Sequence, residues 1–382
     1  MYRISLLVEG YILRKYRAAV IGLGWTGMLY DLAKRPGPAL NQPKFDLDSP
    51  NRPTPEINID RKFNYHEKHF DSGNPTSYAE AFYDREEIDL VAGADRDVTR
   101  LEVFSKRYQV DRLYTDAFKM LAEVKPDIVA ITTNIKGRAD LTVAAVESGA
   151  KGIVTEKPMA NTLEEADRMV TVCREADVPL SCGAISTTHP SFNKAEELIK
   201  AGAIGEIISI EVSKPGSQHQ NWTYFLHSDP QWVIGIGDKD RHEGGSDEFV
   251  GQGMMVAYDG LVTHFRLGAP QLRITGNSGE LVHVPPNPGW ELWQDIDTNY
   301  SNGRVQIPWP GPQTGHYGAI YSVSDVLDCM EGKLAEPKNS GRRVAIALEV
   351  EVALKKSSDQ GGVRLNLPLN DRSLGINYDW FR

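Results

Sequence analysis

The sequence has few features of secreted, membrane-spanning or nucleic-acid-binding proteins. Only three cysteines occur in 382 residues, too few and too scattered for a disulfide framework or a CxxC metal site. No apolar run approaches the roughly 18–20 residues that span a bilayer. The net charge of -10 argues against nucleic acid as a main partner, because phosphate binding needs clustered Lys and Arg. We therefore expect a cytoplasmic protein with reduced, mostly buried cysteines.

Several catalytic signatures are also missing. The sequence shows no P-loop, no nucleophile elbow and no carboxylate pair of the glycosidase type. His242-Glu243 and Asp247-Glu248 cluster in sequence, but their glycine-rich surroundings indicate a loop, and we predict no metal site. Residues 1–16 contain no cleavage site for a signal peptide. We interpret them as an extra N-terminal arm or as the result of a start codon placed too early.

What the sequence does contain is a glycine-rich turn after a short apolar run. Gly22, Gly24 and Gly27 follow residues 18–21 in G-x-G-x-x-G order, and a helix is expected behind them. Gly22 permits a tight turn, Gly24 lets backbone N–H groups approach a pyrophosphate, and Gly27 lets the helix pack close to the strand. The phosphates would lie at the positive end of that helix. Alone, the motif is weak, because glycine-rich turns are common.

Short apolar strands and amphipathic helices alternate through the next hundred residues. This rhythm predicts a parallel sheet covered by helices on both faces. The predicted strands are 88–95, 127–132 and 151–155, and the predicted helices are 77–82, 99–108, 116–122 and 138–148. Ligands of such sheets bind at the carboxyl ends of the strands, which here lead into the glycine loop, residues 132–134 and residues 156–158. We therefore predict a dinucleotide-binding Rossmann domain over 17–158.

Asp95 ends the predicted strand 88–95, where an acid accepts hydrogen bonds from the adenosine ribose. It follows Gly22 by far more than the usual ~20 residues. The excess is a proline-rich segment at about 36–75, which we interpret as a surface insertion or as a lid or subunit contact near the cofactor. Asp95 would repel a 2′-phosphate, whereas Arg96 would accommodate one. The cofactor is NAD or NADP, with NAD slightly favoured.

The second half of the chain has a different pattern of apolar and polar residues. Residues 206–213 alternate as a half-buried antiparallel strand does, and Tyr258-Asp259-Gly260-Leu261 is a hairpin turn signal. Further strands are predicted at 178–183, 232–236, 253–258, 261–265, 271–275 and 363–367, and helices at 163–175, 190–201 and 343–355. We predict an α+β domain over 159–382 with a large, open, mostly antiparallel sheet. It would bind substrate and form the contacts of a homo-oligomer, a dimer or tetramer.

These segments together resemble the Gfo/Idh/MocA oxidoreductases. The resemblance is carried by the glycine loop, Ala94-Asp95, Thr132-Thr133-Asn134, the Glu156-Lys157-Pro158 triplet, and the segments 183–205 and 340–369. It implies an α/β protein with a Rossmann domain and a C-terminal α+β domain. It also implies NAD(P)-dependent redox chemistry on a sugar, sugar acid, cyclitol or glycoside. The residues expected to contact the dinucleotide are Gly22, Gly24, Trp25, Thr26, Gly27, Asp95, Arg96, Thr132, Thr133, Asn134, Glu156 and Lys157.

The resemblance assigns a catalytic role to Lys157. Oxidation of a carbinol needs a group that takes the hydroxyl proton, and a lysine whose pKa is lowered by burial can do so. The family's catalytic histidine matches either Gln218 or, with a shift of one residue, His219, which we favour. Its aspartate position is Asn221, which binds a hydroxyl but cannot act as a base. Arg138 occupies a position where the family often has histidine.

Substrate contacts are predicted for Lys157, Thr188, His189 and Asn221, although His189 also reads as the capping residue of a helix that starts at Pro190. Two other functions remain open. An NAD-retaining hydrolase or lyase would use transient oxidation to loosen a glycosidic bond. A cofactor-binding regulator would have lost its catalytic pair, as Gln218 and Asn221 suggest.

Overall fold

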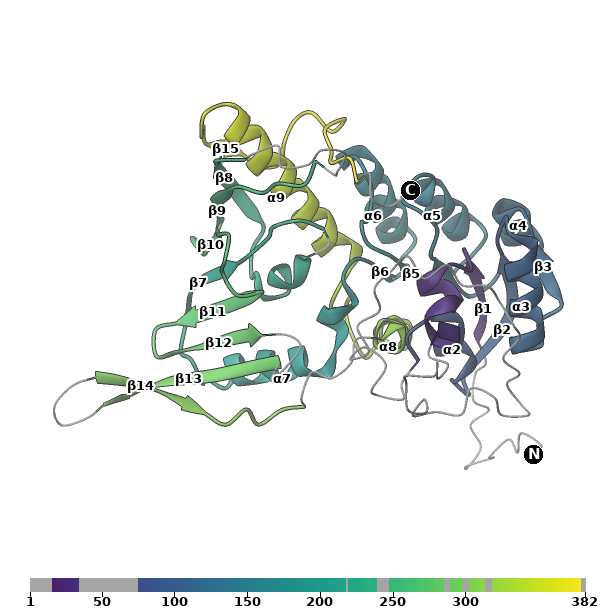
Figure 1. Ribbon diagram of the computed structural model, residues 1–382, viewed down its shortest axis with the longest axis horizontal. Helices are drawn as coiled ribbons and strands as arrows, with labels where there is room; N and C mark the ends of the chain where they lie inside the picture. The colour runs from purple at the N-terminus through teal and green to yellow at the C-terminus, as the bar shows by residue number, and fades with distance from the viewer. Residues whose placement is uncertain are drawn as a thin grey trace.

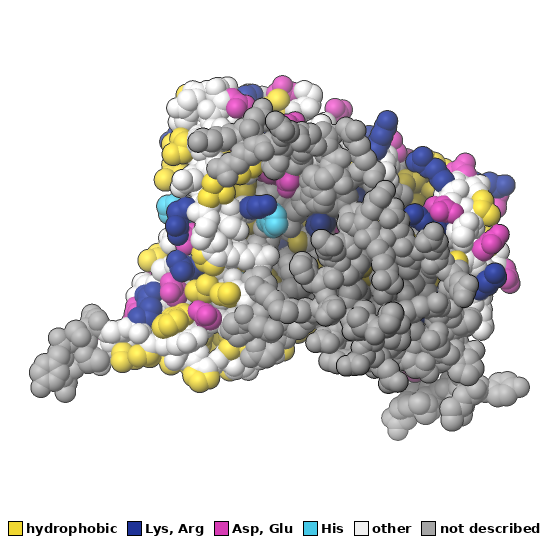
Figure 2. Space-filling model, in the orientation of Figure 1, with side chains coloured by type: hydrophobic (Ala, Val, Ile, Leu, Met, Phe, Trp, Pro, Cys, Tyr) yellow, Lys and Arg dark blue, Asp and Glu magenta, His cyan; other side chains and the backbone are white. Residues whose placement is uncertain are grey.

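The computed structural model describes residues 16–33, 75–217, 219–238, 247–284, 289–297, 302–312 and 318–378. Over these residues the chain forms two β-sheets with their helices, side by side (Figure 1). The predicted N-terminal arm up to residue 15, residues 34–74 of the proline-rich region, and Gln218, His242 and Glu243 lie outside the described residues and are drawn in grey in Figure 2.

Six parallel strands form the first sheet in the order β3-β2-β1-β4-β5-β6. This is the strand order of the doubly wound dinucleotide-binding fold, so the Rossmann prediction is confirmed. The strands are β1 (Tyr16–Ile21), β2 (Ile88–Ala94), β3 (Arg112–Tyr114), β4 (Ile128–Ile131), β5 (Gly152–Thr155) and β6 (Leu180–Ser181). The helices are the π-helical turn η1 (Trp25–Leu29), α1 (Tyr30–Ala33), α2 (Tyr78–Tyr83), α3 (Val98–Tyr108), α4 (Ala117–Val124), α5 (Arg138–Glu147) and α6 (Leu163–Glu175).

Side-chain caps fix where α3, α4 and α6 begin. The side chains of Asp97, Asp116 and Thr162 accept hydrogen bonds from the first free N–H groups of α3, α4 and α6. Such a cap stabilises a helix by about 0.5–2 kcal/mol. The caps account for the agreement of these helices with the predicted segments to within about two residues at either end.

The second sheet has nine strands in the order β14-β13-β12-β11-β7-β10-β9-β8-β15. All neighbours are antiparallel except β7 and β10, which confirms the mostly antiparallel prediction, and the turn at 258–261 joins β9 to β10 as expected. The strands are β7 (Ile207–Val212), β8 (Pro230–Ile236), β9 (Gln252–Ala257), β10 (Val262–Phe265), β11 (Leu272–Gly276), β12 (Gly279–Val284), β13 (Gly289–Asp297), β14 (Asn302–Ile307) and β15 (Leu365–Asn366). The helices are η3 (Ile185–Thr188), α7 (Pro190–Lys200), η4 (Gln220–Phe225), α8 (Ala319–Met330) and α9 (Gly341–Asp359).

Five elements were not predicted from the sequence: β3, β12, β13, β14 and α8. β3 is short, and β13 and β14 carry many charged and polar side chains, so their apolar signal is diluted. α8 does show helical spacing, because its buried Val323, Val326 and Leu327 lie on one stripe; this signal was available.

The predicted boundary at residue 158 does not coincide with the edge of the first sheet. β6 lies beyond it in sequence and pairs with β5. α8 lies further still along the chain and packs against α2 and β5. The long helix α9 runs along β8 and also contacts α6 (Figure 1). The two sheets are therefore tied together by helices from the second half of the chain. Among helices of the described ranges, none is long and apolar enough to cross a membrane.

Candidate functional site

The glycine loop has the backbone geometry that its motif predicts. Gly22 has φ +89°, and a Cβ there would lie 2.9 Å from the backbone of Thr132. A Cβ at Gly27 would collide with the Gly22 carbonyl oxygen, so the close approach of helix and strand requires glycine at this position. Gly24 differs, because the atom nearest to a Cβ there is Arg100 Nη1 at 3.9 Å. Among the described residues, the space beside Gly24 is therefore open.

Hydrogen bonds join this loop to the ends of two neighbouring strands. The Gly22 N–H donates to the Ala94 carbonyl oxygen at 2.7 Å, and the Leu23 N–H donates to Asp95 Oδ2 at 2.6 Å. From β4, Thr132 Oγ1 donates to the Ile21 carbonyl oxygen at 3.0 Å and also contacts the Gly22 carbonyl oxygen. The carboxyl ends of β1, β2 and β4 thus form one connected rim.

The rim fits a dinucleotide. The first N–H groups of a helix have no intrahelical acceptor, and here they adjoin the open space at Gly24. Thr133 Oγ1 is buried and has no hydrogen-bond partner among the described residues. Asp95 lies at the end of β2 beside the loop, as the ribose role requires, although its two oxygens already accept from Leu23 and Asp97 N–H groups. Arg96 and Asn134 are exposed at the same edge, and Trp25 and Thr26 are half-buried.

Replacing Gly24 by valine is expected to weaken NAD binding about 10–100-fold, because the side chain would fill the open space and displace a phosphate from backbone donors worth about 1.5–3 kcal/mol. The backbone at Gly24 has φ -77°, so the substitution causes no strain. Quenching of protein fluorescence by NAD measures the affinity. Gly303→Val, on the outer strand β14, is the matched control. Equal affinity in the two variants would contradict the phosphate role of this loop.

Arg138 organises the next part of the rim. This side chain is fully buried at the start of α5, and its Nη1 donates to the Glu156 carbonyl oxygen at 2.6 Å. The same guanidinium also contacts the carbonyl oxygens of Pro158 and Thr133. It therefore joins the loop after β4 to the loop after β5. In the sequence, Arg138 differs from the family's usual residue but gives no sign of this role, because its partners are backbone atoms that no side-chain pattern reveals.

Lys157 experiences the charges of two buried side chains, Arg138 and Glu156. Burial lowers the pKa of Lys157, and the Arg138 cation lowers it further, while Glu156 and Glu248 oppose the shift. Burial raises the pKa of Glu156, against the effect of Lys157 and Arg138. A lysine whose pKa is lowered has a larger neutral fraction, and the neutral amine is the form that accepts a proton.

The second domain brings His219 to the same place. Burial lowers the pKa of His219 to about 4, and the positive charges of Lys214 and Lys157 lower it further. The imidazole is therefore neutral at neutral pH, and it lies within electrostatic range of Lys157. His219 and Lys157 thus lie within electrostatic range of each other; Gln218 lies outside the described residues.

Asn221 follows on η4 and is 1% exposed. Neither its Oδ1 nor its Nδ2 has a hydrogen-bond partner among the described residues. Leaving a buried amide unpaired costs about 1–3 kcal/mol. Within the described ranges, Asn221 therefore has an unused donor and an unused acceptor near His219 in sequence.

Thr188 and His189 have local structural contacts. Thr188 Oγ1 donates to the Ile185 carbonyl oxygen at 2.7 Å. His189 Nδ1 accepts from the Ser191 N–H at 3.1 Å and caps α7. The capping alternative for His189 is confirmed. Both side chains are almost fully buried, and their contact with substrate stays a prediction.

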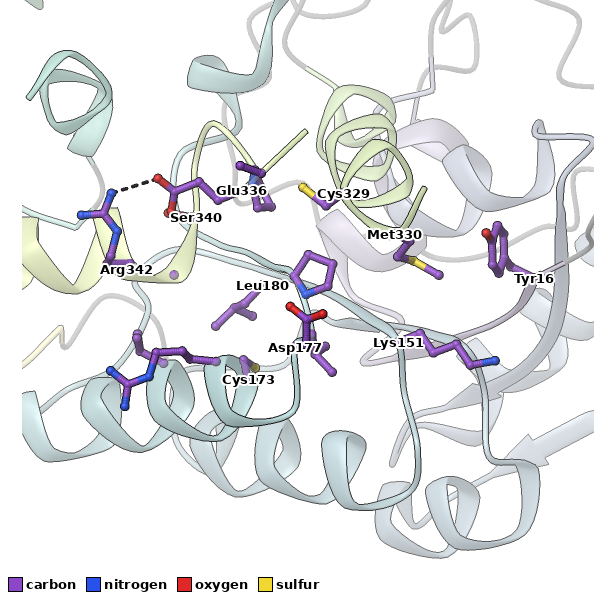
Figure 3. A pocket seen from close by; sticks show the side chains of 17 residues that line it. Tyr16, Lys151, Cys173, Asp177, Leu180, Cys329, Met330, Glu336, Ser340 and Arg342 are labelled. Atoms are coloured by element: carbon purple, nitrogen blue, oxygen red, sulfur yellow. Dashed lines mark hydrogen bonds and ion pairs between the residues drawn. The ribbon is translucent and has the colours of Figure 1, made fainter. Parts of the chain in front are cut away.

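A cavity of about 410 Å³ lies at the opposite, amino ends of β1, β5 and β6. Figure 3 shows Tyr16, Lys151 and Leu180 among its lining, together with Cys173 and Cys329. It contains neither Lys157 nor the glycine loop, and ligands of open α/β sheets bind at the carboxyl ends. We therefore place the candidate site at the rim and not in this cavity. The described residues contain no cluster of three His, Cys, Asp or Glu side chains suited to a metal, and the absence of a metal stays a prediction.

Comparison with known proteins agrees with this geometry. A family model described as an oxidoreductase family with an NAD-binding Rossmann fold matches residues 73–184. A D-apiose dehydrogenase of Paraburkholderia graminis is 32% identical over 129 residues, which is 34% of either protein. Residues 73–184 of this chain therefore match the Gfo/Idh/MocA oxidoreductase family.

Two other proteins extend the likeness along the chain. A myo-inositol 2-dehydrogenase of Thermotoga maritima is 26% identical over 232 residues, 56% of this chain and 66% of that enzyme. The crystal structure of an NAD binding oxidoreductase from Klebsiella pneumoniae superposes with a TM-score of 0.64 over 93% of this chain and all of that one, at 15% identity. This last match shows the fold. The match to the D-apiose dehydrogenase spans about a third of that enzyme's length.

Proposed function

We propose that this protein is an NAD(P)-dependent dehydrogenase of the Gfo/Idh/MocA family that oxidises a CH–OH group of a sugar, sugar acid, cyclitol or glycoside. The observation that carries the proposal is the position of Lys157. It lies on a loop at the carboxyl end of β5, in the same rim as the glycine loop and within electrostatic range of His219. The names of two relatives, a D-apiose dehydrogenase and a myo-inositol 2-dehydrogenase, favour a sugar or cyclitol.

Each side chain of the rim has a distinct task in this reaction. A bound nicotinamide supplies the acceptor for the hydride that leaves the carbinol carbon. Lys157, with its lowered pKa, takes the hydroxyl proton, so the carbinol loses one hydride and one proton. Neutral His219 hydrogen-bonds the same hydroxyl and orients it toward Lys157. Asn221, which cannot act as a base, uses its unpaired amide to hold a neighbouring hydroxyl.

Turnover assays distinguish the proposal from its alternatives. The purified protein is incubated with NAD or NADP and a panel of aldoses, sugar acids, cyclitols and glycosides, and the absorbance of reduced nicotinamide is followed. A dehydrogenase accumulates one reduced nicotinamide per substrate oxidised. Cleavage of a glycoside without net reduction would indicate the hydrolase or lyase. Binding of NAD without any turnover on the panel would favour the regulator.

We also propose that the chain is a homo-oligomer that associates through the open face of the second sheet. Ile234, Met254 and His264 form a row across β8, β9 and β10, beside a shallow depression of about 470 Å³ and the 54% exposed Ile236. Light scattering is expected to give a multiple of the chain mass. Ile236→Lys is expected to give the single-chain mass, because burying an unpaired charge is costly. Tyr258→Lys, at the exposed hairpin turn, is the control. A wild-type protein with the mass of one chain would contradict the proposal.

A further inference from the structure

Glu351 is a buried acid that neither the sequence motifs nor the reaction uses. It lies in the middle of α9 and is 2% exposed. Its Oε1 accepts from the Phe249 N–H at 3.2 Å, and its Oε2 accepts from the Tyr378 hydroxyl at 3.2 Å. A Cβ at Gly216 would collide with the same carboxyl group, so the backbone of that loop lies directly against it. One carboxyl group therefore contacts three segments that are distant in sequence.

These contacts continue into the loop that carries His219. Ser217, next to Gly216, places its Oγ 3.2 Å from the Tyr378 hydroxyl. The His219 N–H donates to the Gly216 carbonyl oxygen at 2.8 Å. Glu351 and Tyr378 thus fix the start of the turn whose end positions His219.

The second segment carries an acid that interacts with Lys157. Glu248 immediately precedes Phe249, and its charge acts on both Lys157 and Glu351. The Asp247 N–H donates to the Asn377 carbonyl oxygen at 2.9 Å, so the segment is held on its other side by the same C-terminal stretch that carries Tyr378. Glu248 of the second half of the chain acts electrostatically on Lys157, and Lys157 in turn acts on His219.

We propose that Glu351 is a positioning residue that holds the His219 loop and the Glu248 segment against Lys157. The expected changes in kcat and KM rest on the proposed dehydrogenase function, whereas the positioning role itself does not. The carboxyl group joins α9 to both segments, so its loss would release two of the groups that surround the reacting lysine. A substitution at Glu351 alone would therefore displace His219 and Glu248, although both of these side chains are still present.

The charge state of Glu351 follows from its surroundings. Burial raises the pKa of Glu351 to about 8, and repulsion by Glu248 contributes. The Phe249 N–H, the Tyr378 hydroxyl and the Lys214 cation oppose the shift. The carboxyl group is therefore mostly protonated at neutral pH. Above about pH 8 it becomes a second negative charge beside Glu248, and repulsion between the two acids would loosen the contacts that it makes.

Three variants test the proposal. Glu351→Ala removes the contacts and is expected to lower kcat by about 10–100-fold, with a smaller effect on KM, because a displacement of about 1 Å at a reacting group costs that much. Glu351→Gln keeps the shape and the hydrogen-bonding capacity of the neutral acid and is expected to restore most of kcat at pH 7. Glu349→Gln is the matched control on the same helix, where Glu349 binds Arg372 and the Leu369 N–H instead.

Dependence on pH separates positioning from simple packing. In the wild type, kcat/KM relative to Glu351→Gln is expected to fall as pH rises through about 8. The melting temperature relative to Glu351→Gln is expected to fall as pH rises from the unfolded pKa of about 4.3 toward about 8, and to level off above it. The sign follows because the folded protein binds the Glu351 proton more tightly than the unfolded chain does. Stability from this group is complete below its unfolded pKa and is lost as pH rises through the folded value.

A measurement that needs no substrate tests the positioning role of Glu351 independently of the proposed function. Histidine NMR of the full chain, with His219 assigned from His219→Gln, follows the pKa of His219. Glu351→Ala is expected to raise it from about 4 toward the ordinary value of about 6.5, and Glu351→Gln to leave it low. Identical His219 titrations in wild type and Glu351→Ala, or identical pH profiles in wild type and Glu351→Gln, would overturn the positioning role. If no substrate is turned over, the proposed dehydrogenase function is wrong. The NMR titration of His219 then still tests the positioning role of Glu351.

Discussion

Lys157→Met is expected to lower kcat by about 10²–10⁴-fold, the usual contribution of a general acid–base group, and to weaken dinucleotide binding far less. Methionine keeps the length and apolar stem of the side chain but has no amine to accept the hydroxyl proton. The loop should stay in place, because Arg138 binds the backbone carbonyl oxygens of Glu156 and Pro158 and not the Lys157 side chain.

Two companion variants sharpen this result. Lys157→Arg is expected to be nearly as inactive, since a guanidinium stays protonated at any working pH. Lys151→Met is the control: it removes a lysine at the other end of β5, where Lys151 pairs with Asp127 at 2.6 Å and is half exposed. Stopped-flow and steady-state absorbance at the reduced-nicotinamide band measure both kcat and cofactor affinity. Wild-type kcat in Lys157→Met would exclude the proton-acceptor role.

The wild-type pH profile carries the same information. For oxidation, kcat/KM is expected to rise as pH increases through the lowered pKa of Lys157, since the neutral amine is the active form. His219, with a pKa of about 4, does not change its charge between pH 5 and 8. The rising limb should therefore disappear in Lys157→Met and persist in His219→Gln, whose lower kcat would reflect lost orientation only.

Local patterns predicted most of the first domain. Gly22 and Gly27 are determined by backbone geometry, which a glycine motif reports directly, and Asp97, Asp116 and Thr162 determine helix starts through contacts two or three residues away. The identities of Asp95 and Lys157 as strand-end residues follow from the alternation of strands and helices. All of these depend on neighbours in sequence or on a repeating unit.

What the sequence did not show depends on partners distant in the chain. Arg138 binds carbonyl oxygens, and every residue has one, so nothing in the sequence marks those of residues 133, 156 and 158 as its acceptors. Glu351 resembles any acid on a helix until α9 is placed against residues 216, 249 and 378. The strand β6 and helix α8 join the first sheet from beyond the predicted boundary, because sheet membership is decided by long-range pairing and not by the position along the chain.

Arg138→Met is expected to destabilise the protein by about 3 kcal/mol or more, because three backbone carbonyl oxygens lose their donor and each unpaired buried group costs about 1–3 kcal/mol. The effect should reach the site as well. The loop that carries Lys157 would no longer be joined to residue 133 of the neighbouring loop, and kcat is expected to fall about 10-fold or more. Urea unfolding and turnover measured on the same preparations give both quantities.

Two further substitutions separate charge from geometry at Arg138. Arg138→Lys keeps a positive charge beside Glu156 but offers one nitrogen in place of a planar guanidinium, so it cannot reproduce donors to two loops in the same directions. It is expected to lie between the wild type and Arg138→Met in both stability and kcat. Arg168→Met is the control, since Arg168 on α6 is half exposed and pairs with Asp140 on the surface, where such a pair contributes about 0–1 kcal/mol. If Arg138→Met and Arg168→Met unfold at the same urea concentration, the guanidinium does not hold the two loops together, and the geometry of Lys157 must be set by the backbone of β5 alone.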